Sequence, residues 1–572
     1  MQVMNFSSTD CKNCYKCVRT CALKAIEVID NRAHIISERC VACGHCLMVC
    51  PQNARDVKSS LSQVMAVLQT SREVVVSIAP SYRGYFEKSG QFFIAALRNL
   101  GFSRIEETAI GAEVVTMAYE DYVKKTNKRE LITTCCPSTV RLIERYYSDL
   151  IPNMIPIVSP MIAHGKMIKA LNKEAYTVFV GPCVSKICEA LSDDSFQDID
   201  AVLTFDELTN YMEECHVSRD TLKPESPDAV GTLRGAKYPV VGGVLNSMRP
   251  ILDERGLEVL RVHGMEQSME VLEALREGRL KNVCIEINSC AESCIAGPGG
   301  HNQVGNVFTR LQGIQRYLRE SKTETLPRIS PYHDVKVTLD KHFKNKQVVI
   351  HTATEAQIKQ IFESMGKLEK KDELNCGACG YKTCREKAIA VINGMSQIDM
   401  CLPYTRSIAE RMSNEIFYNS PNSILIVDRH ARILDLNPQA EQRFGYKAEL
   451  MKGKPIGIMM EDTVFTHALK EKVSIEKEKV SLETFDFIGY RDVIYLEKQQ
   501  ALLILFSDIT EEEKRKQALT VLKGNTLDLT QSIIDKQMRV AQEIASLLGE
   551  TTAETKVAIM KLKHVLQEEG EC

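Results

Sequence analysis

The chain has 572 residues, a length that predicts roughly three to five domains of ordinary size. Hydrophobic residues make up 44% of it, enough for buried cores, and the formal net charge of −3 gives no overall signal for nucleic-acid binding. Because there is no signal-peptide pattern and no apolar run of about 18 residues, we expect a cytoplasmic protein that does not cross a membrane.

The 21 cysteines are the most informative feature of the composition. Most of them cluster at spacings typical of metal ligands. In a large chain without a secretion signal, such clustering favours iron–sulfur clusters in a reducing compartment over disulfides.

Residues 1–58 contain two cysteine runs with the same spacing, C-x2-C-x2-C-x3-C. This is the pattern of two-cluster bacterial ferredoxins, in which the fourth cysteine of each run binds the other cluster. Two zinc sites are the alternative, but zinc sites do not usually have this spacing. The spacing predicts one 4Fe–4S cluster bound by Cys11, Cys14, Cys17 and Cys50, and a second bound by Cys40, Cys43, Cys46 and Cys21.

A larger domain is predicted over residues 72–318. Residues 59–71 are expected to form a linking helix, and the apolar run at residues 74–80 predicts a buried strand. Strand-like and helix-like segments then alternate to about residue 318. This alternation indicates an α/β domain with mainly parallel strands.

Three cysteine motifs follow strand-like segments of this domain: TTCCP at 133–137, GPCVSK at 181–186, and the glycine-rich loop SCAESCIAGPGG at 289–300. A strand that enters a glycine-rich loop presents backbone N–H groups and thiolates together. That combination suits a large anionic cluster better than a bare ion. For the C-x3-C loop taken alone, two buried thiols in a tight turn are the alternative.

In this order the motifs resemble those of the FeFe-hydrogenase family, TSCCP, MPCxxK and ExMACxxGCxxGGG. The resemblance implies an H-cluster, a 4Fe–4S cube joined through one thiolate to a diiron unit with CO, cyanide and a bridging dithiolate. It also implies reversible oxidation of H₂ to protons and electrons. The ligands that the resemblance implies are Cys136, Cys183, Cys290 and Cys294.

The same resemblance implies roles for three neighbouring residues. Lys186 matches a lysine that hydrogen-bonds a cyanide, and an ammonium beside a bound anion is physically reasonable. Cys135 matches the cysteine that passes protons to the bridging amine. Glu189 matches an acid further along that proton relay.

The chain also departs from the family. Tyr119 and Tyr122 stand where the family has two relay glutamates, and a tyrosine with a pKa of about 10 is a poor relay at neutral pH. Gly181 and Asn288 replace two methionines, which predicts a roomier and more polar wall. We therefore expect an intact catalytic centre with a broken proton exit, and slow turnover.

A third cysteine group lies in residues 360–405. Its spacing is similar to that of a small 4Fe–4S module with a CxxCGYxxC signature, and four thiolates suit one cubane cluster. A structural zinc site is the alternative. The candidate ligands are Cys376, Cys379, Cys384 and Cys401.

Residues 413–510 contain no cysteine and resemble a PAS domain. Asn437 and Pro438 are expected to open a helix as N-cap and first helical residue. The missing cysteine argues against a flavin–thiol photosensor. The predicted strands are residues 423–427, 432–437, 483–488, 491–496 and 501–506, and the segment ends on the Asp-Ile-Thr motif of residues 508–510.

Residues 511–572 are predicted to be signalling helices. An amphipathic helix that packs on its own PAS domain is the alternative. No kinase, phosphatase or DNA-binding signature follows, so the expected output is binding, either to a second copy as a homodimer or to an effector such as a kinase or phosphatase. A broken heptad seam of the kind that joins two helices runs through Leu522, Leu529, Ile533, Val540, Ile544 and Leu547.

Together these patterns predict a multidomain α/β protein: a ferredoxin-like 2×4Fe–4S module, an FeFe-hydrogenase H-cluster domain, a small 4Fe–4S module, a PAS domain and C-terminal helices. The predicted function is that of a sensory FeFe-hydrogenase with H₂ and protons as substrates and three accessory 4Fe–4S clusters. A metabolic hydrogenase coupled to a carrier such as ferredoxin is one alternative. A non-catalytic iron–sulfur assembly scaffold is another, although it would need neither Lys186 nor Cys135.

Overall fold

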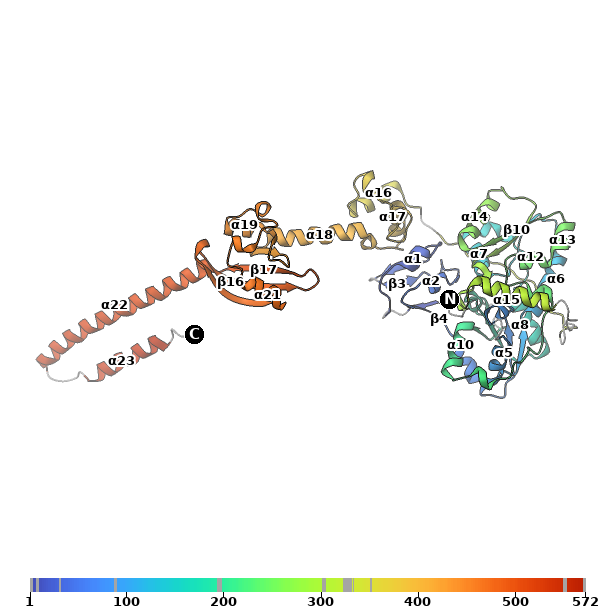
Figure 1. The fold of residues 1–572 in the computed structure, drawn as a ribbon, viewed down its shortest axis with the longest axis horizontal. Helices are drawn as coiled ribbons and strands as arrows, with labels where there is room; N and C mark the ends of the chain where they lie inside the picture. The colour runs from blue at the N-terminus through green and yellow to red at the C-terminus, as the bar shows by residue number, and fades with distance from the viewer. Residues whose placement is uncertain are drawn as a thin grey trace. The chain divides into compact units, whose positions relative to one another are not determined.

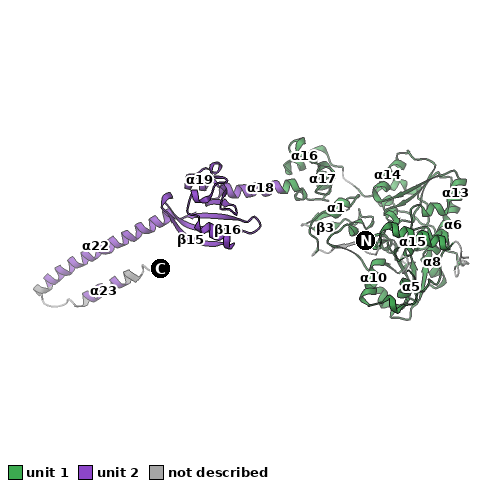
Figure 2. Ribbon diagram, in the orientation of Figure 1, with its two compact units in different colours: residues 1–405 green, residues 406–572 purple. Residues whose placement is uncertain are grey.

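Contacts divide the chain into two compact units, Met1–Thr405 and Arg406–Cys572, which Figure 2 colours separately. Among the described residues, no helix combines the length and the apolar character needed to cross a membrane. The computed structural model describes residues 4–6, 10–29, 32–86, 90–192, 198–300, 305–321, 332, 334–349, 352–548 and 553–568.

The N-terminal module contains two small antiparallel strand pairs and two short helices. Strand β1 pairs with β4, and β2 pairs with β3. Helix α1 packs against α2. The elements are β1 (Met4–Phe6), α1 (Lys16–Thr20), β2 (Ile26–Ile29), β3 (Arg32–Ile35), α2 (His45–Met48) and β4 (Arg55–Val57).

The two cysteine runs of this module fold alike. Each cysteine of the second run stands 29 residues after its counterpart in the first. Backbone angles repeat at the same interval, because the left-handed conformations at Asn13, Tyr15 and Lys24 recur at Ala42, Gly44 and Asn53. An L-residue adopts this conformation at a cost, so its recurrence at matched positions indicates an internal structural repeat.

Residues 72–318 form an α/β domain with two parallel sheets, as predicted. The strand order is β6-β5-β8-β9 in one sheet and β10-β11-β7 in the other. Every residue of β5, β8, β9 and β11 is buried, which explains their continuous apolar runs. The strands are β5 (Val74–Ile78), β6 (Arg104–Glu107), β7 (Glu130–Ile132), β8 (Tyr176–Gly181), β9 (Ala201–Thr204), β10 (Glu258–His263) and β11 (Val283–Asn288).

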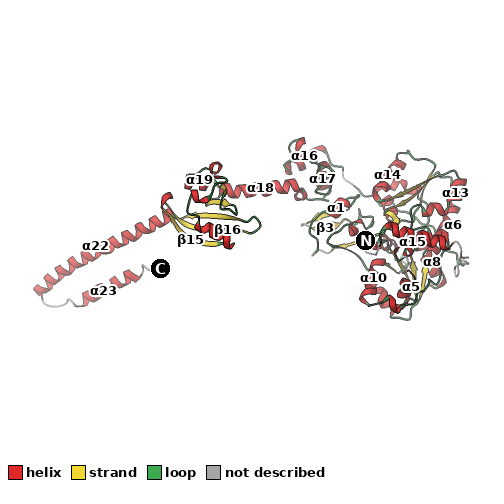
Figure 3. Cartoon of the chain, viewed as in Figure 1, coloured by secondary structure: helices red, strands yellow, loops and turns green. Residues whose placement is uncertain are grey.

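Helices surround these sheets (Figure 3), and the helix at Leu61–Leu68 connects the N-terminal module to β5 in the chain. Two of them, α7 and α8, begin with proline, which is pre-organised for a first helical residue. The helices are α3 (Leu61–Leu68), α4 (Tyr82–Tyr85), α5 (Gly90–Asn99), α6 (Ala109–Lys125), α7 (Pro137–Tyr146), α8 (Pro160–Leu171), α9 (Ser185–Ala190), α10 (Phe205–Glu214), α11 (Leu233–Ala236), α12 (Gly243–Ser247), α13 (Arg249–Glu254), α14 (Met265–Arg276) and α15 (Val307–Glu320).

The segment of residues 332–349, named here the connecting segment, is bound to the α/β domain. The backbone N–H of Val158 donates to the carbonyl of Leu339 at 2.8 Å, and the N–H of Lys341 donates to that of Pro156 at 3.0 Å. The segment brings side chains to the interior of the domain.

The small cysteine module contains α16 (Glu355–Ser364) and α17 (Cys384–Ile392) and contacts the N-terminal module. The ammonium of Lys24 donates to the carbonyl of Gly380 at 2.5 Å, and the guanidinium of Arg19 donates to that of Ala378 at 3.2 Å. A Cβ at Gly380 would stand 2.8 Å from a methyl carbon of Val18, so glycine permits this close approach.

The second unit contains a five-stranded antiparallel sheet in the order β14-β13-β17-β16-β15, of which Figure 1 labels β16 and β17. Four helices accompany it: α18 (Leu402–Asn419), α19 (Pro438–Phe444), α20 (Ala448–Met451) and α21 (Thr463–Glu471). Asn437 caps α19 as predicted. The strands are β13 (Ser423–Val427), β14 (Ile433–Leu436), β15 (Ile475–Leu482), β16 (Phe487–Leu496) and β17 (Ala501–Asp508).

One strand prediction is wrong. Residues Glu483–Phe485 form a 3-10 turn, and the segment from Phe487 onward belongs to the single strand β16. The missing strand is β15, which precedes that turn. Its sequence IEKEKVSL has few apolar residues because β15 is an edge strand that solvent reaches.

The C-terminal helices are α22 (Thr510–Leu548), a continuous helix in Figure 1, and α23 (Ala553–Glu568). The apolar seam on α22 is exposed: the exposed fractions run from 51% at Ile533 and Ile544 to 66% at Leu529. The side chain of Leu547 lies outside the described residues, as does Cys572. The described part of the seam therefore does not pack on the five-stranded sheet. This contradicts the alternative, in which the helix packs on its own domain.

Candidate metal centre

A cavity of about 810 Å³ lies where the strands of both parallel sheets end. Its walls come from the segments that follow β5, β6, β7, β8 and β11. Loops after parallel strands gather at one edge of a sheet, the usual location of ligand sites in such folds. All four implied H-cluster ligands and two implied functional residues line this cavity: Cys136, Cys183, Cys290, Cys294, Cys135 and Lys186.

The glycine-rich loop after β11 packs tightly against the turn after β8. A Cβ at Gly297 would stand 2.5 Å from the carbonyl oxygen of Pro182, and one at Gly299 would stand 2.7 Å from Thr204. The N–H of Gly299 also donates to the carbonyl of Pro182 at 2.7 Å. The glycines thus allow the loop that carries Cys294 to approach the turn that carries Cys183.

The thiols of the cavity are ligands that require a cation. Burial raises the pKa of Cys183 to about 11 and raises the pKa values of Cys290 and Cys294 further. Metal ligands must be thiolates, so the positive charge has to come from what the site binds. Four thiols that line one cavity fit a cluster.

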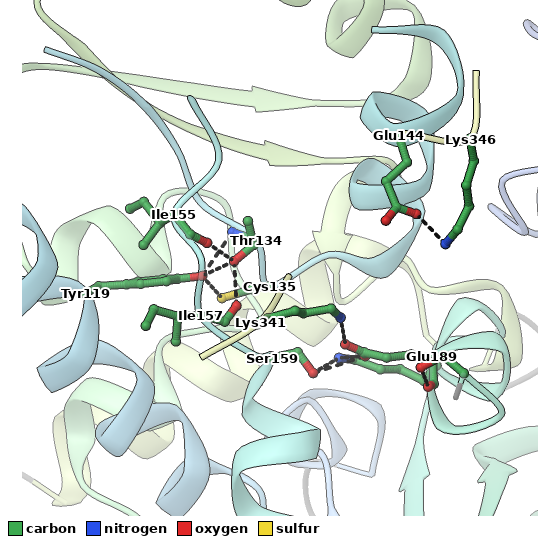
Figure 4. Close-up of polar contacts among 12 residues, drawn as sticks. Tyr119, Thr134, Cys135, Glu144, Ile155, Ile157, Ser159, Glu189, Lys341 and Lys346 are labelled. Atoms are coloured by element: carbon green, nitrogen blue, oxygen red, sulfur yellow. Dashed lines mark hydrogen bonds and ion pairs between the residues drawn. The ribbon is translucent and has the colours of Figure 1, made fainter. Parts of the chain in front are cut away.

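Lys186 is held in place by a buried ion pair with Glu189, which Figure 4 labels together with Ser159 and Lys341. Its ammonium lies 2.7 Å from an oxygen of Glu189 and donates to the hydroxyl of Ser159 at 2.8 Å. Burial alone would raise the pKa of Glu189, but the charges of Lys186 and Lys341 lower it overall. Two of the three donors of Lys186 are thus used, while the ammonium lines the cavity.

Cys135 contacts Tyr119, as Figure 4 also shows. The hydroxyl of fully buried Tyr119 lies 3.4 Å from the Cys135 sulfur and 3.0 Å from the Thr134 hydroxyl. The Thr134 hydroxyl in turn lies 3.1 Å from the carbonyl of Ile155 and 2.9 Å from that of Ile157. A carbonyl accepts a hydrogen bond but passes no proton onward, so this chain of contacts ends inside the protein.

Several predicted residues of the proton relay are not brought together. Glu189 contacts Lys186 and Lys341, whereas the Cys135 sulfur is hydrogen-bonded to Tyr119. Tyr122 lies half-buried one turn further along α6. The role of Glu189 in a relay stays a prediction.

The wall was predicted to be roomier and more polar at Gly181 and Asn288, and the structure supports only the polarity at Asn288. Asn288 lines the cavity and donates to an oxygen of Glu286 at 3.1 Å, so this part of the wall is polar as predicted. At Gly181 the prediction is wrong, because a Cβ there would stand 2.9 Å from both Ala79 and the ring of Phe179. The aromatic ring fills the space that a missing side chain would leave.

A second cavity, of about 490 Å³, lies in the N-terminal module. The predicted ligands Cys21, Cys40, Cys43 and Cys46 line it together. The fourth cysteine of the first run thus joins three of the second, as the ferredoxin pattern requires. The internal repeat puts Cys50 at the corresponding place beside Cys11, Cys14 and Cys17, and that set remains a prediction from spacing and symmetry.

A third cavity, of about 370 Å³, is lined by Cys376, Cys379, Cys384 and Cys401. Lys387 also lines it, a buried residue that sequence reasoning missed, and burial lowers its pKa to about 8. Within the described ranges, no three or more Cys, His, Asp or Glu side chains converge as they would around one ion.

The three cavities are neighbours in the first unit. A Cβ at Gly44, next to Cys43, would stand 2.4 Å from Pro298 in the loop of Cys294, and Cys43 contributes to the raised pKa of Cys290. On the other side, both Cys21 and Cys379 act on the charge of Lys24. The site of Cys21 thus lies next to both of the others.

Comparison with known proteins agrees with this geometry. Residues 72–298 match the family model "Iron only hydrogenase large subunit, C-terminal domain", residues 3–51 match "4Fe-4S dicluster domain", and residues 412–479 match "PAS domain". A model for an Fe-S cluster matches residues 372–403. The chain therefore contains a hydrogenase-like domain, iron–sulfur modules and a PAS domain.

Individual relatives are distant. The chain is 30% identical over 229 residues to Iron hydrogenase 1 of Clostridium pasteurianum, a match that covers 34% of this chain and 39% of that protein. It is 24% identical over 218 residues to Cytosolic Fe-S cluster assembly factor NAR1 of Candida dubliniensis, covering 32% and 37%. A solved variant of [FeFe]-hydrogenase HydA1 from Chlamydomonas reinhardtii aligns with 19% identity and a TM-score of 0.38, over 51% of this chain and all of that one.

Proposed function

We propose that this protein is an H₂-sensing FeFe-hydrogenase with slow turnover, whose redox state is passed through a PAS domain to a partner. One observation carries the proposal: a single cavity gathers four cysteines from three separate loops together with Cys135 and Lys186. Two buried thiols in a tight turn would not require the other two loops.

In this function Cys136, Cys183, Cys290 and Cys294 hold the H-cluster, which when bound supplies the iron chemistry that converts H₂ to two protons and two electrons. Lys186 places a fixed positive charge beside the bound anions, and Ser159 and Glu189 orient it. Cys135 holds a proton at its sulfur, since burial raises its pKa to about 12.

Electrons would leave through neighbouring sites. The packing of Gly44 against Pro298 supports transfer from the large cavity to the site of Cys21, Cys40, Cys43 and Cys46. From there the contacts of Lys24 support transfer to the site of Cys376–Cys401, and the repeat supports transfer to that of Cys11. A carrier such as ferredoxin is a candidate acceptor.

The signalling part rests on the covalent and packing connections of the PAS domain. Helix α18 begins directly after Cys401, and near its end the carbonyl of Phe417 accepts from the buried amide of Asn437 at 3.1 Å. Asn437 caps α19, and at the other end of α19 Arg443 binds Asp508 at 2.5 Å, just before α22. In this proposal α18, α19 and α22 together have two conformations, and a change of charge on the cluster bound by Cys401 favours one of them.

The exposed seam of α22 supports an output by helix pairing. An apolar stripe with heptad spacing is stabilised when a second helix covers it. We propose a homodimer formed through Leu522, Leu529, Ile533, Val540 and Ile544, with a kinase or phosphatase as candidate effector.

Infrared spectroscopy of the matured protein tests the catalytic centre. Bands of bound CO and cyanide are expected, with an iron content that corresponds to three 4Fe–4S clusters plus the H-cluster. A protein that binds iron but shows no such bands would be an assembly scaffold. The match to a protein named as an assembly factor favours testing this alternative.

Hydrogen exchange tests the signalling part. Amide protection in residues 511–548 is expected to differ between H₂-reduced and oxidised protein. Equal protection, with H₂ oxidation demonstrated in the same sample, would favour a metabolic hydrogenase.

A further inference from the structure

A second set of buried polar groups begins at the cavity, on the wall formed by Thr108. Thr108 lines the cavity, and its hydroxyl lies 2.7 Å from the hydroxyl of Ser77. The Ser77 hydroxyl also lies 2.8 Å from Nδ1 of His164. All three residues are buried, with exposed fractions of 4% at most.

The contacts continue beyond His164. Its Nε2 lies 3.1 Å from Oε2 of Glu106, which also accepts a hydrogen bond from Tyr332 at 2.5 Å. The other oxygen of Glu106 lies 2.8 Å from Arg104, whose side chain is 26% exposed. Arg104 in turn lies 3.2 Å from Glu73, whose side chain is 33% exposed, so the contacts reach the surface.

We propose that Thr108, Ser77, His164 and Glu106 form the proton path between this cavity and solvent. The inference rests on the proposed function, because only an H₂-reactive centre would supply the protons. Every member both accepts and donates a hydrogen, which a relay by successive hops requires. The Tyr119 contacts lack this property, since they end on backbone carbonyls.

Each residue of the path gives up one hydrogen for every proton that it takes, so no residue is changed by the transfer. The Thr108 oxygen takes a proton from the cavity and passes its own hydrogen to Ser77, which passes its own to Nδ1 of His164. The imidazole releases the hydrogen on Nε2 to Glu106. Because Glu106 is itself buried, it releases the proton to a water molecule that reaches its oxygen past the partly exposed side chain of Arg104. For each H₂ oxidised, two protons leave in this way, while two electrons leave through the iron–sulfur sites to a one-electron acceptor. The hydroxyls and the imidazole then reorient.

The hydrogen-bond and charged partners of Glu106 suit it to carry a proton for a short time. Burial alone would raise its pKa, but hydrogen bonds from His164 and Tyr332 and the charge of Arg104 lower it overall. An ionised Glu106 can accept a proton and return it. Near the inner end, the hydroxyl of Ser81 lines the same cavity, is 1% exposed, and has no hydrogen-bond partner among the described residues.

Matched substitutions in the full-length matured protein test the path. Thr108→Val removes the hydroxyl with little change of shape, and Thr108→Ser keeps it. Ser77→Ala breaks the path at the next step. Thr177→Val is the control, because Thr177 is a buried threonine on the adjacent strand β8 whose hydroxyl has no partner among the described residues.

Two infrared signals are followed after H₂ is added: the CO and cyanide bands, and the carboxyl band assigned to Glu106 by its loss in Glu106→Gln. Thr108→Val and Ser77→Ala should delay both signals at least about tenfold relative to Thr108→Ser and Thr177→Val. They should also lower the effect of D₂O. Absence of the CO and cyanide bands in the unmodified protein would overturn the proposed function. If the bands are present and change at equal rates in Thr108→Val and Thr108→Ser after H₂ is added, the proposed proton path is wrong, while the proposed function stands.

Discussion

Two buried glutamates lie behind different walls of the cavity, and each contacts one residue of the connecting segment. Glu189 contacts Lys341 and is also paired with Lys186. Glu106 contacts Tyr332 and is hydrogen-bonded to His164. The charges of two ammonium groups lower the pKa of the first, whereas an imidazole and a phenol offer the second protons that can move.

The difference shows that partners, rather than residue type, decide what a buried acid can do. Glu189 matches a relay acid in sequence, yet its charge is used to fix Lys186 in place. Glu106 matches no motif, yet a continuous set of hydrogen bonds joins it to the cavity.

The largest expected effect comes from removing the charge of Lys186, one of the two ammonium groups beside Glu189. Lys186→Met leaves a buried carboxylate with Lys341 as its remaining charged partner and the Ser159 hydroxyl as a neutral donor, which should cost about 3–5 kcal/mol near neutral pH. Hydrogen exchange of the β8 amides measures the free energy of opening. Adding Glu189→Gln should recover much of the loss. A single-variant cost below about 1 kcal/mol would mean that the pair is not a fixed anchor.

A smaller effect is expected on the Glu106 side. Tyr332→Phe removes one hydrogen bond to a carboxylate and should cost about 1.5–3 kcal/mol. It should also raise the pKa of Glu106, because that hydrogen bond stabilises the charged form.

The pH dependence of stability separates this from a packing effect. The lowered pKa of Glu106 gives the folded state stability that is present above the ordinary value of 4.5 and is lost as the pH falls through the folded-state value. In Tyr332→Phe the pKa of Glu106 lies nearer its ordinary value. This variant should therefore lose less stability than the unmodified protein over the same acid range. Equal acid slopes for the two proteins, measured by hydrogen exchange at β5, would show that Tyr332 acts by packing alone.

The smallest expected effect is a rise of about tenfold in H₂ turnover. It comes from giving the wall at Cys135 groups that can pass protons, as the wall at Thr108 already has. Glutamate at both Tyr119 and Tyr122 replaces the closed contacts of Cys135 with groups that exchange protons at neutral pH, so H₂ turnover should rise. In that background Thr108→Val should no longer slow the infrared response. If turnover does not rise, the polar wall at Asn288 becomes the better explanation of slow catalysis.

Much of this protein follows from the sequence by itself. The set Cys136, Cys183, Cys290 and Cys294 comes from three separate loops and was predicted from the family resemblance. The cysteine sets that line the other two cavities were predicted because cysteine spacing within a loop or turn is a local property, and the short segments between ligands restrict where the thiols can lie. The parallel sheets, the helix after Asn437 and the long helix α22 were predicted for the same reason, since periodicity and capping act over a few residues.

Only the tertiary structure decided how the buried acids are used. Tyr332 meets Glu106 across 226 positions of sequence, and Lys341 meets Glu189 across 152, with no local pattern to announce either contact. The ring of Phe179 fills the space beside Gly181, which the sequence motif alone leaves open. These outcomes depend on which surfaces of separate strands and loops come together, and that is set by the packing of the whole domain.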